Sequence, residues 1–316
     1  MIEEYGFSPS EVTLENLGEL SARADIESEA RLYELSDIAD AAAEFSLPLI
    51  DAEVGVPELL SMLSEGLSAG LGVSAAVSSP THSALGNRTL ESVLDRARLT
   101  ELYLGRMSEL SHPLFEGDFL GMPEDGQLYG YVKNPLSDEA YDVLTEELSD
   151  PRVRYYKSFA DCAAALAIGE VEHILLPLEE RGGVRLPTVA ELIYRYDFKI
   201  NSVTPVFGPA ADADVKYAEI SRRFRRSSKR EGDDRYLELR VPAGDGGQLP
   251  ELLLAASALG MSVYRVNTHT LDVEGERVAF FSLVLREGRT DLSPMLTYLG
   301  LFAEDFVPVG VYKNLE

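Results

Sequence analysis

The sequence predicts an α+β protein of several domains: an all-helical N-terminal domain, an α/β lobe of one sheet, and a C-terminal domain of ferredoxin-like βαββαβ order. Three observations predict this class. Apolar residues recur at helical spacing up to about residue 110, β-rich runs alternate with helical runs from 128 to 206, and the order of the expected elements changes after residue 235. With 316 residues, 45% of them apolar, the chain is long enough for two or three domains.

We expect the helical domain over residues 1–111. A long segment at 12–45 is rich in alanine and glutamate, and a third helix follows Asn87. The middle helix has Pro57 in its first turn, where proline is tolerated, and ends near Gly70. Its apolar residues share one helical face: Val56, Leu60, Leu63, Leu67 and Leu71.

Residues 112–126 are rich in proline, glycine and acidic residues, so we expect a linker there and a new domain over 127–221. Within it we expect strands at 128–132, 153–156, 173–178 and 198–203, separated by helices. One helix is well delimited, because Ser158 can cap its start, Asp161 lies in its first turn and Gly169 follows its end. Strand and helix alternation indicates a largely parallel sheet.

Residues 222–235 contain a concentrated run of positive charge, which we expect to be an exposed loop: Arg222, Arg223, Arg225, Arg226, Lys229 and Arg230. The C-terminal domain follows over 236–316. We expect strands at 236–241, 263–268, 278–285 and 306–311, and helices at 249–259 and 291–302.

Charge and composition exclude several functions. The formal net charge is −26, and residues 1–150 carry 30 acidic but only 7 basic side chains, which argues against a nucleic-acid partner. The basic run at 222–230 could bind a polyanion, but a solvated loop is the simpler interpretation. The single cysteine, Cys162, fits a small buried residue, and the four histidines show no metal-ligand spacing, so we expect no metal and no cofactor.

The start Met1-Ile2-Glu3-Glu4 is unlike a positively charged signal peptide, and the apolar stretch at 252–261 is much shorter than the roughly 20 residues that span a bilayer. We therefore expect a cytoplasmic protein without a membrane span.

Segment 159–206, with its turn Pro177-Leu178-Glu179-Glu180, resembles the first lobe of prephenate dehydratase. The βαββαβ segment, which closes on Gly310-Val311-Tyr312, resembles the ACT regulatory domain that follows the dehydratase. The helical segment, through residues 47–63, is similar to the chorismate mutase domain fused ahead of the dehydratase in bifunctional enzymes of phenylalanine synthesis. The resemblance covers nearly the whole chain in the same domain order.

This resemblance implies candidate site residues. Remnants of the two catalytic sites would be Glu179, Ser137 and Lys216 in the dehydratase-like lobe and Arg31 in the mutase-like helices. Contacts to a ligand of the ACT-like domain would come from Gly247, Gln248, Leu249, Asn267 and His269. The implied partners are a small-molecule ligand, an aromatic amino acid in the first place, and a second copy of the chain in a homodimer.

Two departures from the family bear on activity. Val215 stands where the family has a catalytic threonine, and only residues 207–214 lie where the family builds its second lobe. One hypothesis is a non-catalytic relative whose ACT-like domain senses a small molecule or mediates dimerisation. The alternative is an active bifunctional enzyme that converts chorismate to prephenate and prephenate to phenylpyruvate. Domain order alone does not decide between them.

Overall fold

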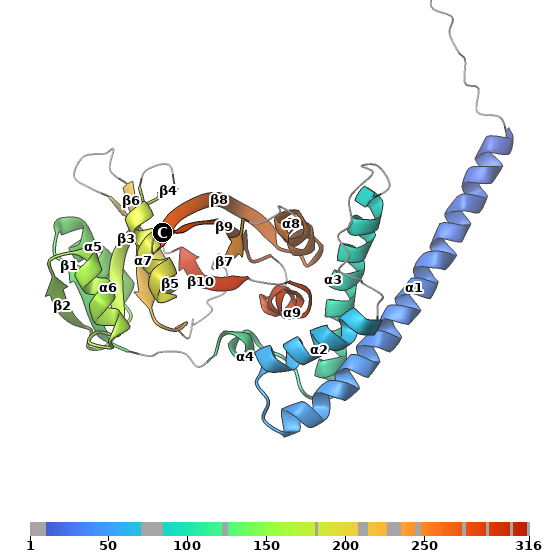
Figure 1. The fold of residues 1–316 in the computed structure, drawn as a ribbon, viewed down its shortest axis with the longest axis horizontal. Helices are drawn as coiled ribbons and strands as arrows, with labels where there is room; N and C mark the ends of the chain where they lie inside the picture. Colours follow the sequence, from blue (N-terminus) through green and yellow to red (C-terminus); the bar gives the residue numbers. More distant parts are fainter. Residues whose placement is uncertain are drawn as a thin grey trace, which may run out of the picture.

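The computed structural model describes residues 11–70, 85–121, 126–180, 183–207, 214–225, 235–243, 248–273, 276–288, 291–303 and 306–314. Within them, helices from the N-terminal part of the chain stand beside a mixed sheet that extends through the rest of the molecule (Figure 1). Among the described helices, none combines the length and the apolar composition that crossing a membrane requires.

The N-terminal part forms three helices: α1 (Glu11–Asp51), α2 (Val56–Gly70) and α3 (Leu85–Glu109). Helices α1 and α3 run side by side in the same direction. Leu35, Ala39, Leu99 and Tyr103 belong to their common core, where the Tyr103 hydroxyl lies 2.9 Å from that of Ser46. Helix α1 extends six residues beyond the predicted end and includes Pro48, which lies in its last turn.

These helices pack against the C-terminal part of the chain. Helix α2 contacts α9 (Ser293–Phe302), and α3 contacts both α9 and α8 (Gln248–Ala258). Val93 and Ala97 of α3 belong to the same buried cluster as the C-terminal sheet and its helices. A short helix, α4 (Glu116–Leu120), lies in the segment where we expected an irregular linker, and Glu116 forms an ion pair with Arg235. The helical part therefore shares its core with the C-terminal part.

The lobe contains β1 (Leu128–Val132), α5 (Pro135–Thr145), β2 (Arg152–Tyr156), α6 (Phe159–Ala167), β3 (His173–Glu180), β4 (Val184–Arg185), α7 (Pro187–Tyr196), β5 (Lys199–Phe207) and β6 (Asp214–Ser221). Strand β1 pairs in parallel with β2 and β3, as the alternation predicts, whereas β6 is antiparallel to both β3 and β5. The Ser158 side chain caps α6, and Gly169 takes a positive φ of 78° after it, so the predicted bounds of this helix are confirmed. Cys162 is fully buried on α6, and burial raises the pKa of its thiol to about 12.

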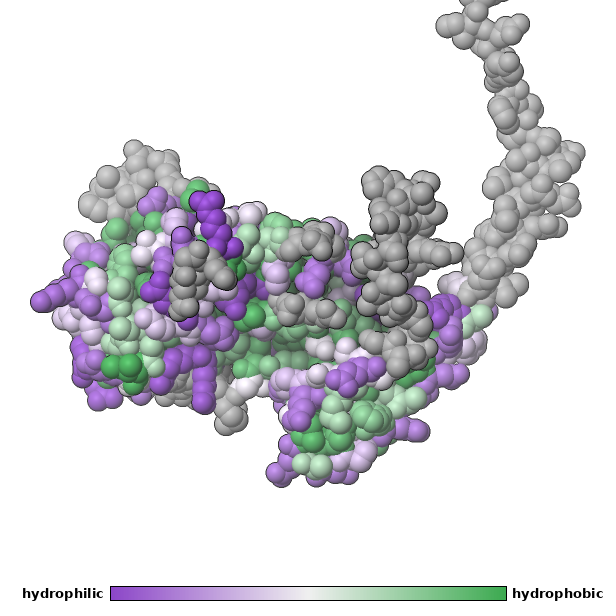
Figure 2. All heavy atoms as spheres, viewed as in Figure 1, coloured by the Kyte–Doolittle hydropathy of each residue, from purple (hydrophilic) through white to green (hydrophobic). Residues whose placement is uncertain are grey.

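The C-terminal part contains β7 (Arg235–Pro242), α8, β8 (Ser262–Val273), β9 (Glu276–Arg286), α9 and β10 (Val307–Asn314), in the predicted order of strands and helices. Helices α8 and α9 cover one face of these strands. In the view of Figure 2, hydrophobic side chains gather over this region, while the lobe shows mostly hydrophilic ones.

The described strands of both parts form one sheet in the order β2-β1-β3-β6-β5-β10-β7-β9-β8, with β4 paired to β3. The two parts join where β10 lies parallel to β5, with Gly310 opposite Ile200. The sequence did not predict this junction, because each half has strands enough for a sheet of its own.

The basic run is only partly an exposed loop. Arg222 and Arg223 are exposed, and residues 226–234 lie outside the described residues. Arg225 instead pairs with buried Glu219, and Arg235 is buried at the start of β7 beside Glu116 and Glu287. Acidic partners supplied by distant elements explain these two differences from the prediction.

Candidate functional site

A groove of about 820 Å³ lies between the lobe and the β8–β9 hairpin. In Figure 1, β8 curves over the side of the molecule on which β4 and β6 lie. The groove is lined by Glu179, Gly183, Val184, Arg185, Pro187, Lys216, Tyr264, Arg265, Asn267, Thr268, His269, Thr270 and Leu271. These residues come from the end of β3, from β4 and the start of α7, from β6, and from β8.

Two β-bulges aim side chains at this groove. The register of β3 against β6 shifts between Pro177 and Glu179, so that Glu179 lies opposite Lys216. The register of β8 against β9 shifts between Val263 and Arg265, and the extra residue is Tyr264. A bulge redirects the side chains around its extra residue. The two irregularities therefore account for the way Glu179, Tyr264 and Arg265 converge from separate strands.

Glu179 is only 3% exposed, and only one of its two carboxylate oxygens accepts a hydrogen bond from a described residue. Arg265 Nη1 donates to Glu179 Oε1 at 2.6 Å, and Arg185 Nη2 lies 3.8 Å from the same oxygen. Oε2 has no hydrogen-bond partner among the described residues. A buried carboxylate oxygen without a donor is costly, so Glu179 has an unused acceptor at the wall of the groove.

Arg185 forms the buried floor of the groove. Both of its terminal nitrogens bond Glu238, with Nη2 at 2.8 Å from Oε2, and Glu238 also accepts from Ser282 at 2.9 Å and Tyr312 at 3.3 Å. Burial alone would raise the pKa of Glu238, but the Arg185 charge and the hydrogen bonds from Arg185, Ser282 and Tyr312 together outweigh it, and the pKa is lowered. Burial followed by the Glu238 charge raises the pKa of Tyr312 well above its usual range. The pair is therefore ionised, and its charges largely compensate each other.

His269 and Asn267 contribute uncharged polar groups. The His269 ring stacks on Phe280 with centroids 5.2 Å apart. Burial, followed by the nearby Arg185 charge, lowers the pKa of His269, so the imidazole is neutral at pH 7. His269 Nε2 and Asn267 Nδ2 have no hydrogen-bond partner among the described residues. We expected His269 at a strand end, but it lies well inside β8 because that strand continues to Val273.

The charged residues of the groove are Glu179, Arg185, Arg265 and Lys216, of which three are cationic. Arg185 is compensated by Glu238 and Arg265 by Glu179, whereas Lys216 makes no ion pair with another described residue. This one cation in excess lies in a chain of net charge −26. The groove can thus attract an anion that the acidic first part of the chain would repel.

The structure brings together residues that the sequence assigned to two sites. Glu179 and Lys216, expected in a dehydratase-like site, share the groove with Asn267 and His269, expected in an ACT-like site. Arg265 was not predicted from the sequence. Its position in a strand of apolar, hydroxyl and amide residues was a usable signal, since a lone cation inside such a strand needs a partner.

The other candidates lie elsewhere. The Ser137 hydroxyl donates to Val132 O at 2.6 Å and accepts from Asn134 N at 3.0 Å, in the capping box of α5. Arg31 bonds Asp95 at 2.9 Å and Glu34 at 2.6 Å on the helical part. Gln248 and Leu249 begin α8, away from the groove, and Gly247 lies outside the described residues.

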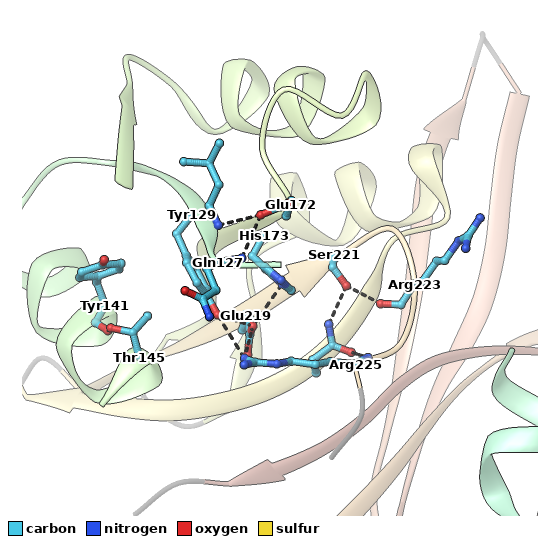
Figure 3. Close-up of polar contacts among 12 residues, drawn as sticks. Gln127, Tyr129, Tyr141, Thr145, Glu172, His173, Glu219, Ser221, Arg223 and Arg225 are labelled. Carbon is cyan, nitrogen blue, oxygen red and sulfur yellow. Dashed lines mark hydrogen bonds and ion pairs between the residues drawn. The ribbon is translucent and has the colours of Figure 1, made fainter. Parts of the chain in front are cut away.

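A second polar cluster surrounds Glu219 of β6 (Figure 3). Its Oε1 accepts from the Tyr129 hydroxyl at 3.0 Å and from Arg225 Nη1 at 2.9 Å, and His173 Nδ1 lies 3.2 Å away. Burial and then the Glu219 charge raise the pKa of Tyr129 above its usual range. Asn201 Oδ1 accepts from the Arg225 backbone N–H at 2.8 Å. Since Tyr129, His173 and Glu219 are fully buried, we assign the cluster the structural role of holding segment 221–225 on the lobe.

The described residues contain no group of three or more histidine, cysteine, aspartate or glutamate side chains able to hold a metal ion. Nothing in the geometry of the groove therefore assigns a metal to it.

No protein-family model matches the sequence, and no curated protein matches it. Solved structures resemble the fold over part of the chain. Prephenate dehydratase from Streptococcus mutans has a TM-score of 0.48 at 11% identity, over 60% of this chain and 100% of its own. GqqA, described as a novel type of quorum quenching acylase, has a TM-score of 0.44 at 22% identity, over 59% and 95%. Prephenate dehydratase from Arthrobacter aurescens in complex with L-Phe has a TM-score of 0.44 at 14% identity, over 58% and 89%.

Proposed function

We propose that this protein is a non-catalytic, ligand-sensing relative of prephenate dehydratase that binds a small carboxylate-bearing molecule, an aromatic amino acid in the first place, in the groove between the lobe and β8. One observation carries the proposal. Arg265 and Lys216 lie beside buried Glu179, whose Oε2 has no donor among the described residues, at the wall of an open groove.

Each group of an amino acid has a counterpart in this groove. The guanidinium of Arg265 and the ammonium of Lys216 suit a carboxylate, and charge-assisted hydrogen bonds of this kind are the strong ones. The carboxylate of Glu179 suits the ammonium group, which brings three donors. Tyr264 is 46% exposed, so its ring offers a surface on which an aromatic side chain can stack.

Binding is better supported than catalysis in both halves of the chain. In the lobe, Val215 replaces the family's threonine, and β5 pairs directly with β6 as far as Phe207 opposite Asp214. In the helical part, the arginines with described side chains, Arg31, Arg96, Arg98 and Arg106, are all paired with carboxylates. A dianion such as chorismate would have to displace those partners.

Isothermal titration calorimetry with L-phenylalanine, L-tyrosine, L-leucine and L-glutamate tests the proposal. We expect the aromatic amino acids to bind and both R265Q and K216Q to weaken binding by about tenfold or more, equivalent to about 1.4 kcal/mol for the loss of a charge-assisted contact. Arg277, an exposed cation on the same hairpin but outside the groove, provides the control R277Q, which should bind like the wild type. Absence of binding, or equal binding by R265Q, would refute the proposal.

The active enzyme is the second candidate, favoured by the position of Glu179 directly opposite Lys216. Incubation with chorismate, and separately with prephenate, against a blank without protein decides it. Formation of phenylpyruvate that is abolished in E179Q would establish a dehydratase, whereas no turnover of either compound supports the sensor. The homodimer remains a prediction, and sedimentation equilibrium should then report twice the chain mass of 34.7 kDa.

A further inference from the structure

The groove follows the open edge of strand β8. Among the described strands, β8 pairs with β9 alone and ends the sheet. Arg265, Asn267 and His269 line the groove, and so do Thr268 and Thr270 between and beyond them. The side chains of successive residues of a strand point to opposite faces of the sheet. Because the groove is lined by residues of both faces, it lies along the edge of β8. Backbone N–H and C=O groups of an edge strand face outward and can pair with another strand.

A second strand edge faces the groove from the lobe. Strand β4 pairs only with β3 among the described strands, and its two residues, Val184 and Arg185, line the groove together with Gly183. Arg265 Nη1 donates to Gly183 O at 2.9 Å and so links the two walls. The groove is therefore bounded by strand edges on both sides.

The groove is longer than one amino acid. The lining of β8 runs from Tyr264 to Leu271, which at a rise of about 3.3 Å per residue corresponds to about 23 Å. An extended chain of about six or seven residues has this length. The volume of about 820 Å³ agrees with an occupant larger than a free amino acid.

The two ends of the groove differ in charge. Arg185 is compensated by Glu238 and Arg265 by Glu179, so the positive charge in excess is that of Lys216, which lies beside Arg265 at the bulged end of β8. Toward Leu271 the β8 lining is Asn267, Thr268, His269 and Thr270, all uncharged at neutral pH. A ligand with one anionic end and an uncharged backbone would complement this arrangement.

We propose that the groove binds the C-terminal segment of a peptide, which adds as a strand to the edge of β8 and places its α-carboxylate on Arg265 and Lys216. The inference rests on the proposed function for the carboxylate site and extends the ligand from a single amino acid to a chain. Main-chain hydrogen bonds to β8 supply affinity in this mode of recognition, and alternate side chains supply specificity. Charge complementarity and the two unpaired strand edges select this occupant.

The experiment compares ligands of increasing length by calorimetry: L-phenylalanine, N-acetyl-phenylalanine, and the acetylated pentapeptide Ala-Val-Thr-Val-Phe with a free carboxyl terminus. A second series carries the same peptide as its C-terminal amide and as four variants, each N-methylated at one peptide bond. We expect the pentapeptide acid to bind at least tenfold more tightly than N-acetyl-phenylalanine. Amidation should remove binding, and N-methylation should weaken it at every second position only, because alternate N–H groups of an added strand point toward β8.

The two proposals fail in different ways. Equal affinity for N-acetyl-phenylalanine and the pentapeptide would refute the strand addition but leave the carboxylate site standing. The same holds if N-methylation does not weaken binding at alternate positions. If no ligand of the series binds, both proposals fail. Loss of pentapeptide binding in K216Q, with retention in the control R277Q, would place the carboxylate at the proposed end of the groove.

Discussion

At the scale of single residues, stability depends strongly on a few charged side chains that are buried. Glu238 and Arg185 are both nearly inaccessible to water and have to compensate each other, because transfer of an unpaired charge into the interior is far costlier than loss of a neutral hydrogen bond. The same two residues support the floor of the groove. Substitutions here should therefore affect stability before they affect binding.

We expect E238Q to lower the free energy of unfolding by about 3–5 kcal/mol, because it leaves Arg185 buried without a counter-charge. Urea denaturation followed by circular dichroism measures the change. The double variant R185M/E238L, which removes both charges and keeps apolar volume, should recover most of the loss. A double variant as unstable as E238Q would show that the charges themselves are not the cause.

Protonation of His269 should make the protein less stable in mild acid. Its pKa is lower in the folded state than in the unfolded chain, so between the ordinary value near 6.5 and the lowered one the unfolded state binds more protons. Stability linked to this residue is fully present above about pH 6.5 and is lost as the pH falls below it. Thermal unfolding between pH 7.5 and 5 should thus show a shallower decline for H269N than for the wild type, while H112N, at a histidine outside the groove, should follow the wild type.

The site was predictable residue by residue only where a motif marked it. Glu179 stands in a recognisable turn, and Asn267 and His269 occupy positions that the resemblance to the ACT domain implies. That these residues meet in one groove was not predictable, because the contact of Glu179 with Arg265 joins positions 86 residues apart. Two register shifts create this contact, and a bulge leaves little trace in a single sequence.

At the scale of elements, the packing of α2 on α9 ties the helical part to the rest of the molecule. Gly300 of α9 lies against fully buried Leu60 of α2, and a Cβ placed on Gly300 would be 2.5 Å from Leu60 Cδ1 and 3.2 Å from Leu60 Cβ. The absence of a side chain at this position lets the helices approach closely.

We expect G300A to destabilise the protein by about 1–2 kcal/mol, since overpacking outweighs the better helix propensity of alanine. Gly66 of α2 provides the matched control, because nothing lies within 4 Å of a Cβ placed there, and G66A should stabilise the protein by about 0.5–1 kcal/mol. Chemical denaturation of both variants, and of G300A/L60A, checks the assignment. Additive effects of G300A and L60A would contradict a direct contact.

Elements with local signals were predicted best. Capping by Ser158 and the glycine at 169 marked α6 on both sides. Strand β8 proved longer than expected, because its second half is polar and carries no periodic apolar pattern, and two-residue β4 has no sequence signal of its own. The end of α1 was missed, because the helix continues through Pro48 to Asp51, beyond the alanine- and glutamate-rich segment that marked it.

At the scale of the whole molecule, charge is distributed unevenly along the chain, whereas the described strands form one continuous sheet. Residues 1–150 carry a net charge of −23, which disfavours the compact state through self-repulsion. The sequence predicted this asymmetry directly, whereas the continuity of the sheet depends on tertiary pairing that composition cannot show.

Added salt should therefore stabilise the protein. We expect the thermal midpoint to rise as sodium chloride increases from about 0.05 to 0.5 M, because screening weakens repulsion among the carboxylates more than it weakens the surface ion pairs, each of which contributes little. Potassium chloride should act equally, since the effect is one of ionic strength. A midpoint that falls with salt would show that ion pairs dominate over the net charge.

The β10 strand has a consequence for the order in which the molecule matures on the ribosome. Of the described strands it comes last in the sequence, and it alone connects β5 of the lobe with β7 of the C-terminal part. Until residues 307–314 have left the exit tunnel, a nascent chain presents two incomplete sheets with open central edges. Such edges attract foreign strands, so the interval before β10 docks is when this protein most needs protection by a chaperone.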